Sequence, residues 1–263
     1  MTAPTLSPAA EAARAGDEPR FLAALCAPPE RRERLFALVA LNLELARIPV
    51  TVSEPMLGEI RLQWWRDALE DLFERGRAAG HEVIAALAAA APPDPAPLYE
   101  MVEARRLALA PGGLSESDLE AFLAGTAGAL MRAEVQALGG GAKAEEAAAL
   151  AGWAEGAGRL VAALPAMMAE GSAPFDETAA REGAALRARL AALAQEGLAR
   201  LARARALRAE VPRAARAPLL SAHVAERALR AAIRPGYDPF APDAPSPFRL
   251  RGGLLLRAAF GRY

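Results

Sequence analysis

The sequence predicts an all-α fold in a single domain, because apolar residues recur at helical spacing, strand patterns are scarce and no linker divides the chain. Of its 263 residues 53% are hydrophobic, but only 5% are aromatic. Alanine accounts for much of that hydrophobic content, and it favours closely packed helices over a sheet core. We expect a helical bundle over residues 17–263, preceded by a mobile segment over residues 1–16.

Two long helices are expected in the N-terminal third. A proline pair precedes a segment with apolar residues at three- and four-residue steps, which predicts a helix over Pro29–Ile48. Pro49 and Pro55 bracket a predicted interruption, and a second amphipathic helix is expected over Glu59–Gly76. We place the following residues on its apolar face: Ile60, Trp64, Trp65, Ala68, Leu69, Leu72 and Phe73.

The later helices are separated by turns rich in proline or glycine. Ser115 and Asp118 resemble a capping box, in which a serine side chain accepts a hydrogen bond from a backbone N–H at the start of a helix. Short connections between successive helices are typical of a compact bundle. The further helices that we predict are Leu98–Ala110, Ser115–Leu138, Ala142–Glu170, Asp176–Ala209, Pro212–Ile233 and Phe248–Phe260.

Charge is nearly balanced over the whole chain but unevenly distributed along it. The net charge is −1, yet the segment from Arg181 onward has sixteen arginines against six acidic residues, a local balance of +10. Such a segment is either a solvated helix face or a surface for an acidic partner or anionic lipid headgroups. Aromatic residues, which stack on bases, are almost missing from it, so we expect no nucleic acid partner.

Cysteine use and hydropathy indicate a cytoplasmic protein. Cys26 is the single cysteine and cannot form an internal disulfide. Because it follows an apolar helix, we expect it in the core and not as a nucleophile. No apolar run approaches the ~20 residues of a membrane-spanning helix. Met1–Gly16 lacks the basic start and apolar stretch of a secretory signal.

Metal and phosphate motifs are weak or missing. His81 and His223, the two histidines, have no cysteine or carboxylate pair beside them in the sequence, so a zinc site is not expected. Asp67 and Asp71 have the spacing that places two carboxylates on one helix face. Neighbouring arginines such as Arg66 favour a solvated face with ion pairs instead. No glycine-rich phosphate loop is present.

Several motifs resemble one known family. They are Arg20–Pro28, Arg31–Asn42, Ser53–Asp67, Gly125–Gly128 and Gly236–Phe240. They are distributed over most of Arg20–Tyr263 and resemble the squalene/phytoene synthases, which implies the isoprenoid synthase fold. The Ser53–Asp67 string is the specific part, and it resembles a branch of the family that is associated with the assembly of respiratory complex I.

The resemblance also implies where catalytic carboxylates should lie. Active members condense two prenyl diphosphates head to head, and aspartate-rich motifs on facing helices hold Mg²⁺ against the diphosphates. In our placement the acids of the first motif are replaced by Ala46, Arg47 and Val50. Departure of the diphosphate would then lack the Mg²⁺ ions that neutralise its negative charge.

The second acidic motif would fall across Arg159–Glu170. There Ala166 and Ala169 replace expected acids, and Glu170 alone survives. One acid does not organise the two or three Mg²⁺ ions that this chemistry uses. Glu170 therefore joins Asp67 and Asp71 only as a weak candidate for a metal ligand, and we assign neither catalytic residues nor a cofactor.

Arg61, Trp64 and Trp65 are the weak candidates for contact with a ligand. The tryptophans could line a prenyl channel or anchor a partner, although tryptophan on the apolar face of a bundle helix is more often core. Arg61 could bind a diphosphate. Two functions follow: a non-catalytic protein that binds a partner, which the resemblance implies is a complex I subunit at the membrane face, or alternatively an active Mg²⁺-dependent prenyl transferase.

Overall fold

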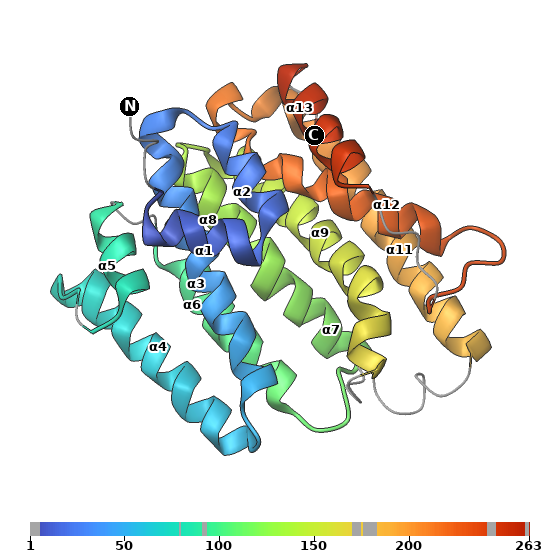
Figure 1. Ribbon diagram of the computed structural model, residues 1–263, viewed down its shortest axis with the longest axis horizontal. Helices are drawn as coiled ribbons and strands as arrows, with labels where there is room; N and C mark the ends of the chain where they lie inside the picture. The colour runs from blue at the N-terminus through green and yellow to red at the C-terminus, as the bar shows by residue number, and fades with distance from the viewer. Residues whose placement is uncertain are drawn as a thin grey trace.

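The computed structural model describes residues 6–78, 80–90, 94–169, 175, 183–240, 246–260 and 263, with the backbone alone for 247–250. The all-α prediction is confirmed: these residues form helices, apart from one isolated bridge between Leu114 and Phe175. Figure 1 shows them as one bundle, with α4 and α5 along one edge and α11 and α12 along the opposite edge.

The bounds of the helices follow the periodic segments of the sequence. The α-helices are α1 (Pro8–Gly16), α2 (Glu18–Leu25), α3 (Arg32–Thr51), α4 (Pro55–Arg75), α5 (Glu82–Ala89), α6 (Ala96–Arg106), α7 (Glu116–Leu123), α8 (Ala129–Ala137), α9 (Ala142–Ala169), α11 (Gly183–Ala206), α12 (Ala222–Ala232) and α13 (Pro247–Ala259). A π-helical turn, η3 (Ala124–Gly128), joins α7 to α8. Short 3₁₀ segments are η1 (Pro29–Arg31), η2 (Leu107–Leu109), η4 (Leu207–Glu210), η5 (Arg213–Ala215) and η6 (Pro218–Ser221).

The N-terminal segment differs from expectation. Over residues 1–16 we expected mobility, but Pro8–Gly16 forms α1, whose Ser7 cap accepts a hydrogen bond from the Ala10 N–H. Ala9, Ala10 and Ala13 are buried, and α1 packs against α3. The expectation of mobility is therefore wrong for α1, because small alanine side chains let this helix lie closely on its neighbour.

The predicted interruption after the first long helix is shorter than expected. Helix α3 continues through Pro49 to Thr51, and α4 begins at Pro55. Pro49 lacks the N–H that would donate to the Leu45 carbonyl, so α3 loses one hydrogen bond there and ends two residues later. The Thr51 hydroxyl donates to the Arg47 carbonyl at 2.8 Å and satisfies an acceptor in the last turn. The serine cap is confirmed, since Ser115 Oγ accepts from the Asp118 N–H at 3.1 Å, and its hydroxyl donates to the Asp118 carboxylate at 2.6 Å.

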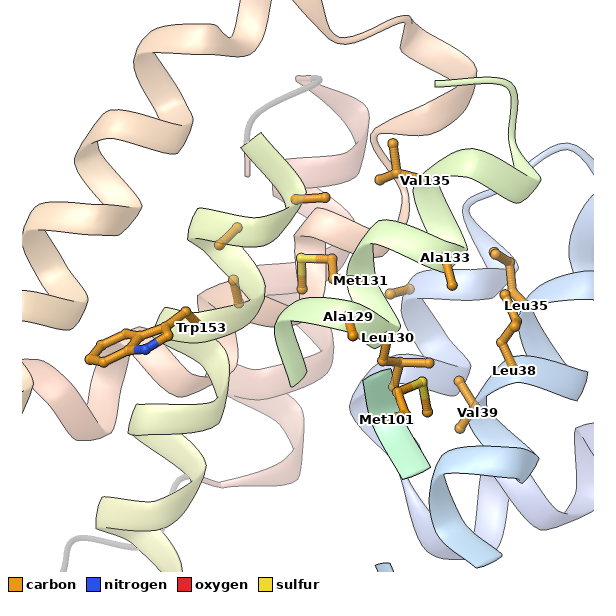
Figure 2. Close-up of a cluster of buried hydrophobic side chains, with 14 of the residues drawn as sticks. Leu35, Leu38, Val39, Met101, Ala129, Leu130, Met131, Ala133, Val135 and Trp153 are labelled. Atoms are coloured by element: carbon orange, nitrogen blue, oxygen red, sulfur yellow. The ribbon is translucent and has the colours of Figure 1, made fainter. Parts of the chain in front are cut away.

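The hydrophobic core lies between α3, α6, α8 and α9. Figure 2 shows Leu35, Leu38 and Val39 of α3 meeting Met101 of α6 and the side chains of α8. Helix α9 passes through the centre of the bundle and packs on α8, α11 and α12. Alanine and glycine predominate along α9, which allows its neighbours to approach closely.

Gly158 is the point of closest approach between α9 and α12. A Cβ atom there would lie 2.5 Å from the backbone oxygen of Ala225. We expect Gly158→Ala to destabilise the protein by about 1–3 kcal/mol, because the two helices must move apart. Gly252→Ala, where an added Cβ meets nothing within 4 Å, is the matched control. Urea unfolding measures both, and equal stability of the two variants would contradict the close packing.

Candidate functional site

The positions at which we place the acids of the first motif carry no carboxylate. Ala46, Arg47 and Val50 lie in the last turns of α3, where Arg47 donates to Glu44 at 2.9 Å. Arg47 and Val50 are exposed. The Glu44 carboxylate of this end of α3 is thus engaged by a guanidinium group, which itself repels a divalent cation.

The segment in which we place the second acidic motif lies on the C-terminal half of α9. Ala166 and Ala169 are exposed there and offer no oxygen ligand. Glu170, the surviving acid, lies outside the described residues. Arg159, at the start of the segment, is held by two carboxylates, Asp17 at 2.7 Å and Glu155 at 2.8 Å.

The other acidic candidates lie on the outside of α4. Asp67 is exposed and accepts from the Gln63 amide at 2.8 Å, while Asp71 pairs with Arg75. This is the solvated, ion-paired face that the neighbouring arginines indicate. In the part of the chain that the structure describes, no group of three or more His, Cys, Asp or Glu side chains could hold a metal ion.

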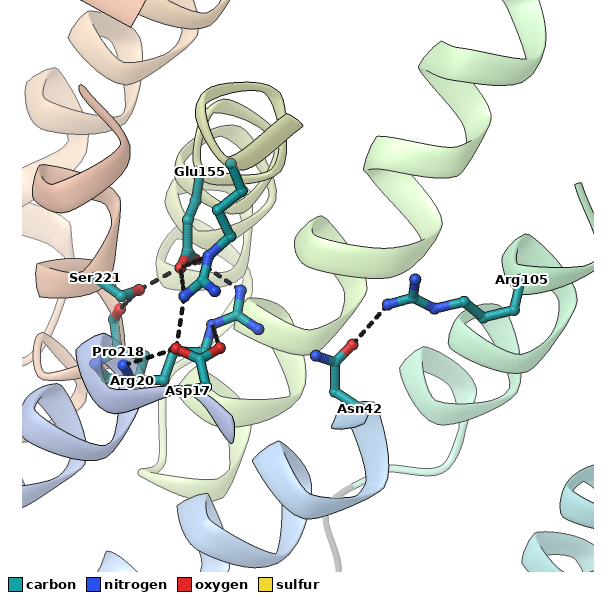
Figure 3. A network of polar contacts seen from close by, with 8 residues as sticks. Asp17, Arg20, Asn42, Arg105, Glu155, Pro218 and Ser221 are labelled. Atoms are coloured by element: carbon teal, nitrogen blue, oxygen red, sulfur yellow. Dashed lines mark hydrogen bonds and ion pairs between the residues drawn. The ribbon is translucent and has the colours of Figure 1, made fainter. Parts of the chain in front are cut away.

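A buried ionic network joins α9 to the N-terminal helices and to η6. It comprises Asp17, Arg20, Glu155, Arg159 and Ser221, and we call it the central network. Figure 3 labels all of these residues except Arg159. Glu155 is fully buried and accepts from Arg20 at 2.7 Å, from Arg159 at 2.9 Å and from the Ser221 hydroxyl at 3.1 Å. Asp17 accepts from Arg159 at 2.7 Å and caps α2 through the Arg20 N–H.

The pKa values of two buried carboxyl groups in this region are shifted in opposite directions. Burial by itself would raise the pKa of Glu155, but Arg20 and Arg159 outweigh it and lower that pKa to about 2. Burial raises the pKa of Glu134 to about 8, because Arg20 offsets only part of the desolvation. One carboxyl oxygen of Glu134 has no hydrogen-bond partner among the described groups. Glu155 is thus an ionised structural acid, and Glu134 is a neutral one.

The central network was not foreseen from the sequence. Arg20 and Glu155 are separated by 135 positions along the chain. A sequence signal did exist, because Glu155 and Arg159 have the i,i+4 spacing of an ion pair within a run of alanine and glycine. Charged residues in such a small-residue segment indicate buried pairing. The network holds its own charges in compensated pairs and leaves no carboxylate facing a metal.

A surface pocket brings together the three candidate contact residues of the sequence. Arg61, Trp64 and Trp65 meet at a pocket of about 330 Å³ between α3, α4 and the start of α5. We call it the Arg61–His81 pocket. Its lining residues are Glu44, Arg47, Ile48, Thr51, Arg61, Trp64, Trp65 and His81.

Aromatic rings form one wall of the Arg61–His81 pocket. The Trp65 ring lies 4.8 Å from the His81 ring and 5.1 Å from the Trp64 ring, both edge to face. His81 caps α5, and its Nδ1 accepts the Val83 N–H at 3.2 Å, which leaves the proton of the neutral imidazole on Nε2. Arg61 donates to the Thr51 hydroxyl at 3.1 Å. The pocket therefore places the donors of Arg61 and His81 beside aromatic surface, while Glu44, an acid of its lining, is paired with Arg47.

The two tryptophans have different environments. Trp65 is 5% exposed and belongs to the core, whereas Trp64 is 44% exposed and Ile60 is 59% exposed. The expectation that all three share one buried face is therefore wrong for Ile60 and Trp64. The buried stripe of α4 follows alternating four- and three-residue steps, and it comprises Gly58, Leu62, Trp65, Leu69 and Leu72.

Cys26 is also placed differently from expectation. It is exposed at the C-terminal end of α2, where its thiol contacts the Leu22 carbonyl at 3.5 Å. The expectation of a core cysteine is wrong because the residue caps the helix and so lies past the buried face of α2.

Comparison with curated proteins finds a local similarity. Over 63 residues the chain is 40% identical to assembly factor 6 of NADH dehydrogenase (ubiquinone) complex I from Homo sapiens, and 41% identical to that of Rattus norvegicus. The match covers 24% of this chain and 19% of those relatives, so it spans about a fifth of their length.

The similarity to solved structures and to a family model extends over more of the chain. The crystal structure of a dehydrosqualene synthase in complex with ligand aligns with a TM-score of 0.77 over 96% of this chain and 94% of that one. At 16% sequence identity the likeness shows the fold. The squalene/phytoene synthase model matches residues 13–164, more than half of the chain. The resemblance seen in the sequence is thereby confirmed, and the chain belongs to the squalene/phytoene synthase family.

Proposed function

We propose that this protein is a non-catalytic member of its family that binds a protein partner and acts as an assembly factor, with respiratory complex I as its target. The observation that carries the proposal is the lack of carboxylates at the described motif positions of α3 and α9. An arginine, Arg47, takes the place of one expected acid, and alanines take the place of three others. These alanines are Ala46, Ala166 and Ala169.

The chemistry explains why this loss matters. A diphosphate leaving group departs readily only when bound cations neutralise the charge that develops on it. Binding of an apolar prenyl tail does not replace that stabilisation, because uniform binding leaves the chemical barrier unchanged. Arg159 does not substitute for a metal, since Asp17 and Glu155 already compensate its charge.

Complex I is proposed as the target because of the local similarity to its assembly factor 6. We further propose that the protein works at the inner face of the cytoplasmic membrane, beside a partner embedded there. The +10 balance from Arg181 onward favours an anionic surface. In the described part of the chain, no helix is long and apolar enough to cross a bilayer.

The alternative function is a Mg²⁺-dependent prenyl transferase of the squalene or phytoene synthase type. Its support is the fold, which aligns with a dehydrosqualene synthase along nearly the whole chain. Under this alternative, Glu170 and acids outside our placement would have to hold Mg²⁺.

Deleting the gene in its host tests the two functions against each other. We expect assembled complex I and NADH-dependent respiration to fall, because an assembly intermediate loses its binding partner. The purified protein with Mg²⁺ and farnesyl or geranylgeranyl diphosphate should form no C30 or C40 product. Unchanged complex I together with a Mg²⁺-dependent product would overturn the proposal and establish the prenyl transferase.

A further inference from the structure

Helix α4 has a second apolar face that the bundle does not cover. Opposite its buried stripe lie Met56, Leu57, Ile60 and Trp64, with exposed fractions of 69%, 45%, 59% and 44%. We call these four residues the outer stripe. Met56, Ile60 and Trp64 follow at four-residue steps and therefore align along one side of the helix over about 12 Å. An apolar patch of this kind on a soluble surface marks an interaction site.

The outer stripe ends at the Arg61–His81 pocket, because Trp64 belongs to both. Arg61 lies on the flank of the stripe, and its hydrogen bond goes to the Thr51 hydroxyl. Among the described residues, no carboxylate lies within ion-pair distance of Arg61. Arg47 of the same pocket is already paired with Glu44 at 2.9 Å. The Arg61 guanidinium and the Nε2–H of His81 therefore remain to bind one further carboxylate in a pocket of about 330 Å³.

The opposite flank of the stripe has a different charge. Glu59 pairs there with Arg106, and Asp67 is exposed with its carboxylate bonded to Gln63. One flank is thus basic and the other neutral to acidic. An anionic membrane would repel the acidic flank, whereas a protein segment can carry opposite charges along its two sides. The charge pattern favours a protein segment over a lipid surface.

We infer that the outer stripe and the Arg61–His81 pocket together dock an amphipathic helix of a protein partner, with an aspartate or glutamate of that helix entering the pocket beside Arg61. Helix α4 lies along one edge of the bundle, where a second helix can approach it (Figure 1). Apolar residues of the partner, spaced at three and four positions, pack on Met56, Ile60 and Trp64. The pocket carboxylate then fixes the register. This inference rests on the proposed function and adds the surface and the chemistry of the partner.

The first test uses the amount of assembled complex I as the measure of binding between this protein and its partner. Ile60→Glu and Arg61→Glu are returned to the deletion strain, and each is expected to lower the amount of assembled complex I at least about tenfold, as loss of a central anchor does. Leu25→Glu on α2 and Arg14→Glu on α1 are matched controls, since both side chains are exposed and lie outside the outer stripe, the pocket and the basic segment from Arg181 onward. Circular dichroism and thermal unfolding of each purified variant confirm that it folds.

The second test identifies the chemistry of the occupant. A photoreactive residue placed at Leu57 in the full-length protein is cross-linked in cells, and the product is mapped by mass spectrometry. The expected product is a segment of another protein with an acidic residue within roughly two helical turns of its apolar residues. Replacing that acid by arginine should abolish association with the wild type and restore it with Arg61→Glu.

The outcomes separate this inference from the proposed function. If Arg61→Glu supports wild-type complex I while Ile60→Glu does not, the pocket inference is wrong and the proposed function stands. Cross-links to lipid, to a second copy of this chain, to a segment without acids, or to nothing also overturn the inference. If gene deletion leaves complex I unchanged, the proposed function fails, and the cross-link with charge-swap rescue decides the inference by itself.

Discussion

Glu155→Gln is expected to lower the free energy of unfolding by about 3–5 kcal/mol, the usual cost of breaking a buried ion pair from one side. The substitution preserves the shape of the side chain but removes its charge. Arg20, which is buried, then keeps only the longer contact with Asp17 at 3.9 Å. Arg159 keeps only Asp17. The loss comes from leaving buried guanidinium charge uncompensated, which a neutral amide oxygen does not repair.

Urea unfolding at neutral pH measures this loss. Glu146→Gln is the matched control, because its ion pair with Lys143 also involves α9 but is largely exposed. We expect less than about 1 kcal/mol from the control. The pKa of Glu155 is lowered from 4.5 to about 2, so its contribution is present above pH 4.5 and is lost as the pH falls toward 2. Wild type and Glu155→Gln should therefore converge in acid, and a pH-independent difference would contradict this assignment.

Glu134→Gln should have the opposite effect and stabilise the protein at alkaline pH. Burial raises the pKa of this carboxyl from 4.5 to about 8. In the wild type the folded state therefore binds a proton that the unfolded state releases, and stability falls as the pH rises between these values, by at most about 1.4 kcal/mol per pH unit. Glutamine resembles the neutral acid in shape and does not titrate, so the variant avoids this loss.

Paired measurements at pH 5 and pH 8 test the assignment. The two proteins should have similar stability at pH 5, and Glu134→Gln should exceed the wild type by a few kcal/mol at pH 8, roughly the integral of that slope. Glu134→Leu is a useful companion, because it removes the ionisable group together with the unpaired oxygen. A wild type whose stability stays constant over this range would show that Glu134 is ionised in the folded state.

The helical segments could be predicted because their signals are local. Apolar spacing predicted α4, and the cap of α7 followed from Ser115 and Asp118. The end of α3 was less predictable. Pro49 has a strong local preference against a helix interior, but one missing donor near a helix end is tolerated when tertiary packing favours the helix.

The candidate site was predictable only in part. Arg61, Trp64 and Trp65 were recognised in the specific string of α4, but the sequence did not place His81 beside them. The division of the tryptophans into one buried and one exposed side chain depends on which side of α4 meets the bundle. Apolar spacing does not decide this when both sides of a helix are apolar.

The sequence by itself therefore determined the helical fold and the family, because each depends on residue identity or on spacing within one helix. It also predicts the loss of acidic ligands at Ala46 and Ala166. Only the tertiary structure decided that Glu155 meets Arg20 and that the outer face of α4 remains uncovered. These features depend on distances between segments far apart in the chain and on which faces the neighbouring helices bury. Residue types restrict those arrangements, but the packing of the whole bundle selects one of them.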